Sequence, residues 1–141
     1  MLVRLMYASR AVAAFDHEEL HAILRQSRRN NPALGVTGVL CWSQGLFLQV
    51  LEGGRSAVNR LYNRIAADAR HGQVELLHYE EIQERRFAGW AMGQVDMAQL
   101  NPALVLKFSE TGVLDPYAIS GNASLTLFGE LVATASVMCA P

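Results

Sequence analysis

The stretch LFLQVLEG at residues 46–53 constrains the fold most, because it is apolar on both faces of the strand that it would form. Alternate side chains of a strand point to opposite sides, so Gln49 shares one face with Phe47, while Leu48 and Val50 lie on the other. A strand of this kind is normally covered on both sides. A buried amide without partners costs roughly 2–7 kcal/mol. We therefore expect polar groups near Gln49.

Length and charge limit the partners of this chain. The 141 residues, 51% hydrophobic and 18% charged, suffice for one well-cored domain and an appendage. The net charge of -1, from 12 basic and 13 acidic residues, leaves no basic stripe for nucleic acid and no polybasic segment for a membrane. Arg4 interrupts the apolar N-terminal stretch, which therefore lacks the core of a signal peptide, and no apolar run approaches membrane-spanning length. We expect a cytoplasmic protein.

Periodicity and turn residues predict the element order βαββαββ within residues 1–95. Asp16 and Glu19 form a capping box that begins the first helix, which we expect to end near residues 30–32. The second helix is predicted at 56–70, and the strands are predicted at 2–8, 35–42, 46–53, 74–80 and 87–95. This alternation predicts an α+β, ferredoxin-like domain, in which two helices pack on one face of a five-stranded mixed sheet.

Residues 96–141 are predicted to form a helical extension rather than a separate enzyme domain. Two short amphipathic helices are indicated, joined by a Gly- and Pro-containing loop at 112–121. We expect them to cover the other face of the sheet, over Leu48 and Val50, or to carry a subunit contact. Their apolar positions are Leu100, Leu104, Val105, Leu125, Phe128, Leu131, Val132 and Ala135.

Polar side chains converge on the inward side of the predicted sheet and helices. The apolar stripe of the first helix turns polar at its C-terminal end, and one edge of the stripe of the second helix is charged. Two interpretations stay open: a satisfied internal polar network, or a pocket for a flat ligand with an amide edge. The residues concerned are Tyr7, Ser27, Asn31, Gln49, Arg64, Asp68 and His71.

Six short motifs make the chain resemble the BLUF domain, a blue-light sensor that uses flavin. They occur in the order and spacing of that family over about residues 1–95. The resemblance is specific because all six occur together. The motifs are YAS at 7–9, RRNNP at 28–32, GVTGVL at 35–40, FLQVLEG at 47–53, DARH at 68–71 and RRFAGWAM at 85–92.

The resemblance implies a role for each matching residue. Tyr7 would be the electron and proton donor, and Gln49 the switching amide between that phenol and the flavin, which is FAD, with FMN as the alternative. Asn31 would bond the amide edge of the ring. Trp90 and Met92, expected on one strand face, match the pair that relays the signal. Further flavin contacts are implied for Ser9, Ile23, Asn30, Arg64, Ile65, Asp68 and His71.

The resemblance also implies a function. The chain would be a photoreceptor with a reversible photocycle and no enzymatic activity, acting on a separate effector protein as a homo-oligomer. Ala91 stands where many family members have Ser, and Val36 replaces a common Ile. These departures bear only on how the last strand reports the signal.

Two other functions fit parts of the sequence. HEELH at 17–21 matches the H-E-x-x-H zinc pattern. Glu19 is better used in the capping box, both His lie on the same helix edge as Arg25 and Arg28, and no third ligand is evident. We therefore expect no metal. The second alternative is a flavin-binding regulator of the same fold without photochemistry.

Overall fold

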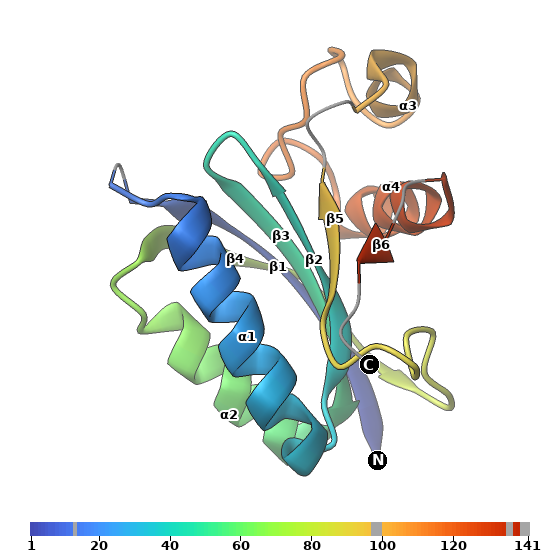
Figure 1. Ribbon diagram of the computed structural model, residues 1–141. Coiled ribbons are helices and arrows are strands. Elements are labelled where there is room, and N and C mark those ends of the chain that lie inside the picture. The colour runs from blue at the N-terminus through green and yellow to red at the C-terminus, as the bar shows by residue number, and fades with distance from the viewer. Residues whose placement is uncertain (13, 97–99, 135–136, 139–141) are drawn as a thin grey trace.

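The computed structural model describes residues 1–12, 14–96, 100–134 and 137–138. The elements follow each other in the predicted order over the first 96 residues, and the helical extension follows them (Figure 1). The bounds are β1 Leu2–Ala11, α1 His17–Leu34, β2 Thr37–Ser43, β3 Leu46–Gly54, α2 Arg55–Ala66, β4 His71–Ile82, β5 Gly93–Asp96, α3 Pro102–Leu106, α4 Gly121–Thr134 and β6 Val137–Met138.

One mixed sheet forms the centre of the molecule, with strand order β4-β1-β3-β2-β5-β6. The neighbouring strands are antiparallel except β2 and β5, which are parallel. The predicted five strands and the ferredoxin-like arrangement are confirmed, and the short strand β6 adds a sixth at the edge beside β5. Helices α1 and α2 cover one face, here called the inner face, and α4 covers the other, the outer face (Figure 1).

Helix α1 begins where the capping residues predict and ends later than predicted. The side chain of Asp16 accepts a hydrogen bond from the backbone N–H of Glu19. The helix passes through Pro32 and ends at Leu34, because Gly35 adopts the left-handed conformation (φ 70°) that closes a helix C-terminus.

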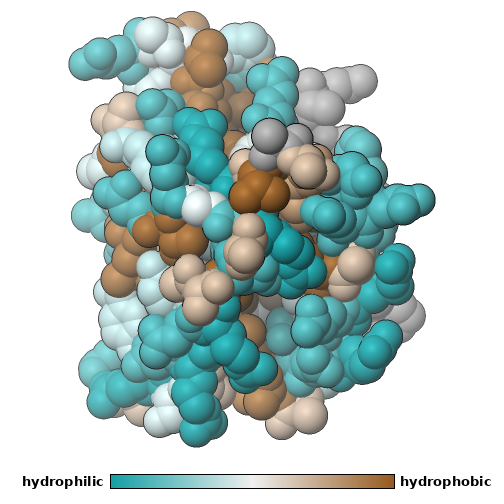
Figure 2. All heavy atoms as spheres, turned by 90° about the vertical axis from the view of Figure 1, so that its left-hand side faces the viewer, coloured by the Kyte–Doolittle hydropathy of each residue, from teal (hydrophilic) through white to brown (hydrophobic). Residues whose placement is uncertain are grey.

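Hydrophilic side chains dominate the solvent side of the helix layer (Figure 2). Within the described part of the chain, no helix is both long and apolar enough to cross a bilayer.

Helix α2 is shorter than predicted, and this moves two site residues off it. The helix ends at Ala66, whereas 56–70 was expected, so Asp68 lies in a turn and His71 begins β4. The Asp68 carboxylate accepts a hydrogen bond from the backbone N–H of Arg70, a local bond that competes with helix continuation. The interpretation of Asp68 and His71 as one edge of a helix was therefore wrong.

Strand β5 is also shorter than predicted. It covers Gly93–Asp96, whereas a strand at 87–95 was expected. The residues before it form a turn, in which the backbone N–H of Trp90 donates to the carbonyl of Phe87. The carbonyl of Trp90 then accepts from the N–H of Gly38, so the segment is held against the start of β2 without being a strand.

Two hydrophobic cores lie on opposite faces of the sheet. Leu5 and Leu51 pack against Leu20 of α1 on the inner face. On the outer face, Leu48 and Val50 pack with a group from α4 that comprises Leu127, Phe128 and Leu131. The expectation that Leu48 and Val50 lie beneath the C-terminal helices is therefore confirmed. Residue 135, expected in the last helix, lies outside the described residues.

Candidate functional site

A cavity of about 290 Å³ lies between the inner face and the two helices. All the predicted site residues line it except Ser9, Trp90 and Met92. Strands, both helices and the turn after α2 contribute to it, so it forms only when these elements pack together. Its lining residues are Tyr7, Ile23, Gln26, Ser27, Asn30, Asn31, Leu34, Leu40, Phe47, Gln49, Leu61, Arg64, Ile65, Asp68, Arg70 and His71.

Tyr7 and Gln49 form a buried polar pair at the base of this cavity. They are directly opposite each other on β1 and β3. The Tyr7 hydroxyl donates to Gln49 Oε1, and Gln49 Nε2 lies 3.2 Å from Met92 Sδ. The Gln49 side chain, 4% exposed, therefore has a partner at each end of its amide. A thioether is a weak acceptor, so a stronger acceptor placed in the cavity can compete for Nε2.

The environment of Tyr7 keeps its phenol protonated. Burial raises its pKa far above the ordinary value, and repulsion of a Tyr7 phenolate by the ionised forms of Tyr62 and Asp68 adds to the effect. The ring of Tyr62 lies 5.7 Å from that of Tyr7, between centroids. A neutral phenol has a proton to donate, and Gln49 Oε1 is the acceptor that it contacts.

The walls of the cavity are apolar, and Asn31 supplies an amide at one end. Ile23 from α1 and Ile65 from α2 are half-buried on facing helices. Asn31 is buried, and its Nδ2 lies 3.4 Å from the carbonyl oxygen of Ala91. Asn30 beside it is exposed. A flat ring with hydrogen-bonding edges suits this combination of apolar walls and two amides.

Charged side chains gather at the turn between α2 and β4. The Asp68 carboxylate accepts hydrogen bonds from the Arg70 guanidinium on both of its oxygens. This bidentate pair holds the pKa of Asp68 below its usual range. Arg64, on the last turn of α2, is exposed. Arg70 was missed as a site residue, although it lies within the quoted DARH motif. The sequence did contain a signal for it, because Arg70 follows Asp68 by two residues and can form a local ion pair with it.

Ser9 acts on the cavity through His71. The Ser9 hydroxyl lies 2.8 Å from His71 Nδ1, while His71 Nε2 is hydrogen-bonded to the carbonyl of Ile65. Ser9 itself does not line the cavity. Both ring nitrogens of His71 are therefore used inside the protein, so the imidazole is held in one orientation at the rim.

Trp90 and Met92 lie on opposite faces of the sheet, so their expected common strand face was wrong. Met92 is buried in the inner core beside Gln49. Trp90 packs with the outer core, where its ring stacks on Phe87 with centroids 5.5 Å apart. The reason is the turn at Phe87–Trp90, which breaks the alternation on which the expectation rested.

The zinc alternative finds no supporting geometry. His17 and His21 are exposed at the start of α1. No group of three or more His, Cys, Asp or Glu residues among those described is placed to hold a metal ion. The buried thiol of Cys41 lies in the outer core, and burial raises its pKa far above the ordinary value.

Fold and site together define a small α+β domain whose cavity, between the sheet and two helices, suits a flat ring with hydrogen-bonding edges. The family model described as BLUF, sensors of blue-light using FAD, matches residues 2–93. The chain belongs to this family, and it is a blue-light sensor domain that binds flavin.

Relatives and solved structures agree with this assignment. The chain is 40% identical over 92 residues to the beta subunit of the photoactivated adenylate cyclase of Euglena longa, a match that covers 64% of this chain and 11% of that protein. It is similar to BlsA in its photo-activated state, with a TM-score of 0.87 and 30% identity over 98% of this chain and 100% of that one. The dark-state structure of BlrB gives a TM-score of 0.78 and 34% identity over 94% and 95% of the two chains. The chain thus spans about a tenth of the cyclase relative.

Proposed function

We propose that Tyr7 and Gln49 are the photoactive pair of this sensor. The single observation that carries the proposal is the buried hydrogen bond from the Tyr7 phenol to Gln49 Oε1 at the wall of the cavity. A buried neutral phenol has a proton to give, and a carboxamide offers both acceptors and donors, so it can receive the proton and re-form its bonds.

The cavity residues would hold the flavin by three kinds of contact. Asn31 and Gln49 offer amides to the edge of the ring, and Ile23 and Ile65 offer apolar contact to its faces. We infer that a polar rim binds the ribityl chain or phosphate; it comprises Asn30, Arg64, Asp68 and His71, and Ser9 is hydrogen-bonded to His71. FAD is proposed as the cofactor, with FMN as the alternative; chromatography of the flavin released by denaturation identifies it.

The chemistry follows from the order of the hydrogen bonds. Flavin, when bound, supplies an oxidant that is strong only in its light-excited state. Tyr7 would give one electron to the excited flavin and would pass the proton on its Oη to Gln49 Oε1. The return of electron and proton restores the phenol, while Gln49 re-forms its bonds in a rotated or tautomeric form. Because a thioether is the partner of Nε2 among the described residues, breaking this contact costs about 1 kcal/mol or less and frees the Met92 side chain from the amide.

We further propose that the signal leaves through the C-terminal extension, residues 96–141, to a separate effector protein. Helix α4 packs on the outer face of β3, the strand that carries Gln49 on its inner face. A homo-oligomer is proposed because β4 is an edge strand and leaves Leu76 and Tyr79 exposed. No enzymatic activity is assigned to these 141 residues.

Absorption spectra before and after blue light test the photoactive pair. We expect the purified protein to be yellow and to show a reversible red shift. Tyr7→Phe and Gln49→Leu should keep flavin and lose the shift, because each removes a hydrogen-bonding group of the pair. The control is Tyr62→Phe, which changes a neighbouring ring that does not line the cavity. An unaltered photocycle in Tyr7→Phe would refute the role of Tyr7 and favour the flavin-binding regulator without photochemistry.

A further inference from the structure

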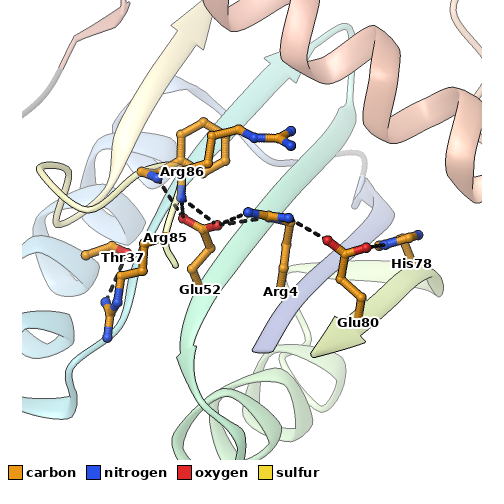
Figure 3. A network of polar contacts seen from close by, with 8 residues as sticks. Arg4, Thr37, Glu52, His78, Glu80, Arg85 and Arg86 are labelled. Carbon is orange, nitrogen blue, oxygen red and sulfur yellow. Dashed lines mark hydrogen bonds and ion pairs between the residues drawn. The ribbon is translucent and has the colours of Figure 1, made fainter. Parts of the chain in front are cut away.

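A buried carboxylate on the outer face has no part in the chemistry above. Glu52 lies three residues after Gln49 on β3, and its side chain is 0% exposed. It pairs across the strands with Arg4 on the same face (Figure 3). A buried charge is costly unless it is paired and fully hydrogen-bonded, so such a residue needs a structural reason for its place.

Among the described residues, the polar partners of the Glu52 carboxylate are the Arg4 guanidinium and two backbone N–H groups. Oε1 accepts from the N–H of Phe87 at 2.7 Å and from the N–H of Arg86 at 3.0 Å. Oε2 accepts from Arg4 Nε at 2.9 Å and lies 2.7 Å from Arg4 Nη2. Arg4, 5% exposed, also pairs with Glu80 on β4. The carboxylate is therefore held by the Arg4 guanidinium on one side and by the two backbone N–H groups on the other. Figure 3 shows how these contacts continue through Arg4 to Glu80.

The two N–H groups begin the crossing segment, residues 86–92, which passes from the outer face to the inner face. Phe87 lies in the outer core and Met92 in the inner core. At the far end of the segment, Arg28 Nε donates to the carbonyl of Met92 at 3.0 Å. Glu52 therefore holds the start of the segment, and a side chain from α1 holds its end.

We propose that Glu52 is a positioning residue of the light response, a fixed point from which the crossing segment places Met92 against Gln49 and Trp90 against the outer core. The proposal rests on the photoactive role of Gln49 given above. Because the carboxylate is buried and hydrogen-bonded through both oxygens, a change at the Met92 thioether is transmitted along the segment to Trp90 instead of being absorbed at its start. Glu52 and the cavity lie on opposite faces of the sheet, so its role is in the response and not in flavin binding.

The test compares Glu52→Gln with Glu81→Gln, both in a Trp42→Phe background that leaves Trp90 as the remaining tryptophan. The amide keeps one acceptor oxygen but turns an N–H₂ group toward Arg4 or the backbone donors, whereas Glu81 forms only an exposed pair with Arg55. We expect Glu52→Gln to keep flavin and the dark spectrum. Its dark-recovery rate should change about fivefold, the factor that one hydrogen bond contributes, and its light-induced change in Trp90 fluorescence should be lost.

Recovery rates and Trp90 signals that match those of Glu81→Gln would overturn the proposal. If Glu52→Gln does not hold flavin, the Arg4→Met/Glu52→Gln double variant, which removes both charges, takes its place. Its recovery rate and Trp90 signal are then compared with those of Glu81→Gln, and a match would overturn the proposal. Amide exchange in the unaltered protein needs no variant: the Phe87 N–H should exchange slowly in the dark and under light, and faster exchange under light would also overturn the proposal. Absence of a light-induced shift in the unaltered protein would instead refute the photochemistry itself.

Discussion

Truncation of Phe128 tests whether α4 stabilises the domain by packing on the outer face. The side chain is fully buried in the outer core, and its ring meets that of Phe87 edge-on with centroids 6.0 Å apart. Replacing a buried Phe by Ala costs about 3–5 kcal/mol, through lost burial and the cavity left behind. A small domain is stable by only about 5–15 kcal/mol, so Phe128→Ala should remove a large share of the free energy of unfolding.

Urea unfolding followed by circular dichroism measures this loss, with the flavin content matched between proteins because bound ligand adds stability. Leu106→Ala is the control, since Leu106 is in α3 of the same extension but is 52% exposed, and it should change stability by no more than about 0.5 kcal/mol. Flavin binding by the folded variant should persist, because the cavity lies on the other face. A loss below about 1 kcal/mol for Phe128→Ala would refute the docking of α4 as the source of stability.

Two further predictions concern Tyr7 and Gly121. Because burial raises the Tyr7 pKa, the phenol stays protonated in the folded protein above pH about 10, where the unfolded chain ionises, so stability should fall with rising pH by up to about 1.4 kcal/mol per pH unit. Urea titrations at alkaline pH measure this slope, and an equal slope in Tyr7→Phe would contradict it. A Cβ at Gly121 would lie 1.7 Å from the carbonyl oxygen of Leu77, so Gly121→Ala should displace the start of α4 from β4 and cost about 1–3 kcal/mol, whereas Gly54→Ala meets no atom within 4 Å. Equal urea midpoints for the two glycine variants would show that α4 does not approach β4 so closely.

Local patterns predicted most of the fold and the centre of the site. Alternation along β3 placed Gln49 on one face and Leu48 on the other, and the structure confirms both. The helical stripe placed Asn31 at the cavity, because residues four apart share a helix face. The motifs of the resembling family then attached a flavin to these positions, and the family match supports that step.

Two of the errors occur where a local bond interrupts a periodic pattern, and a third concerns a contact between residues far apart in the chain. The Asp68 carboxylate bonds to the N–H of Arg70 at the turn where α2 has ended, so Asp68 and His71 reach the cavity from a turn and a strand. The Phe87–Trp90 turn interrupts alternation before β5, so Trp90 and Met92 separate. Ser9 reaches the site only through His71, 62 residues away in the chain, a contact that periodicity does not report.

The sequence by itself determined which faces of the strands and helices are apolar and which polar groups lie on the inner face, because hydrophobic periodicity depends on neighbours one or two turns away. Only the tertiary structure decided where the crossing segment runs. Its path depends on the bonds from Arg86 and Phe87 to Glu52, over sequence separations of 34 and 35 residues. Glu52 lies near the end of an apolar strand, and no periodic pattern in the sequence identifies its partners. They appear only in the fold, where β1 places Arg4 beside the carboxylate and residues 86–87 bring two N–H groups within hydrogen-bonding distance.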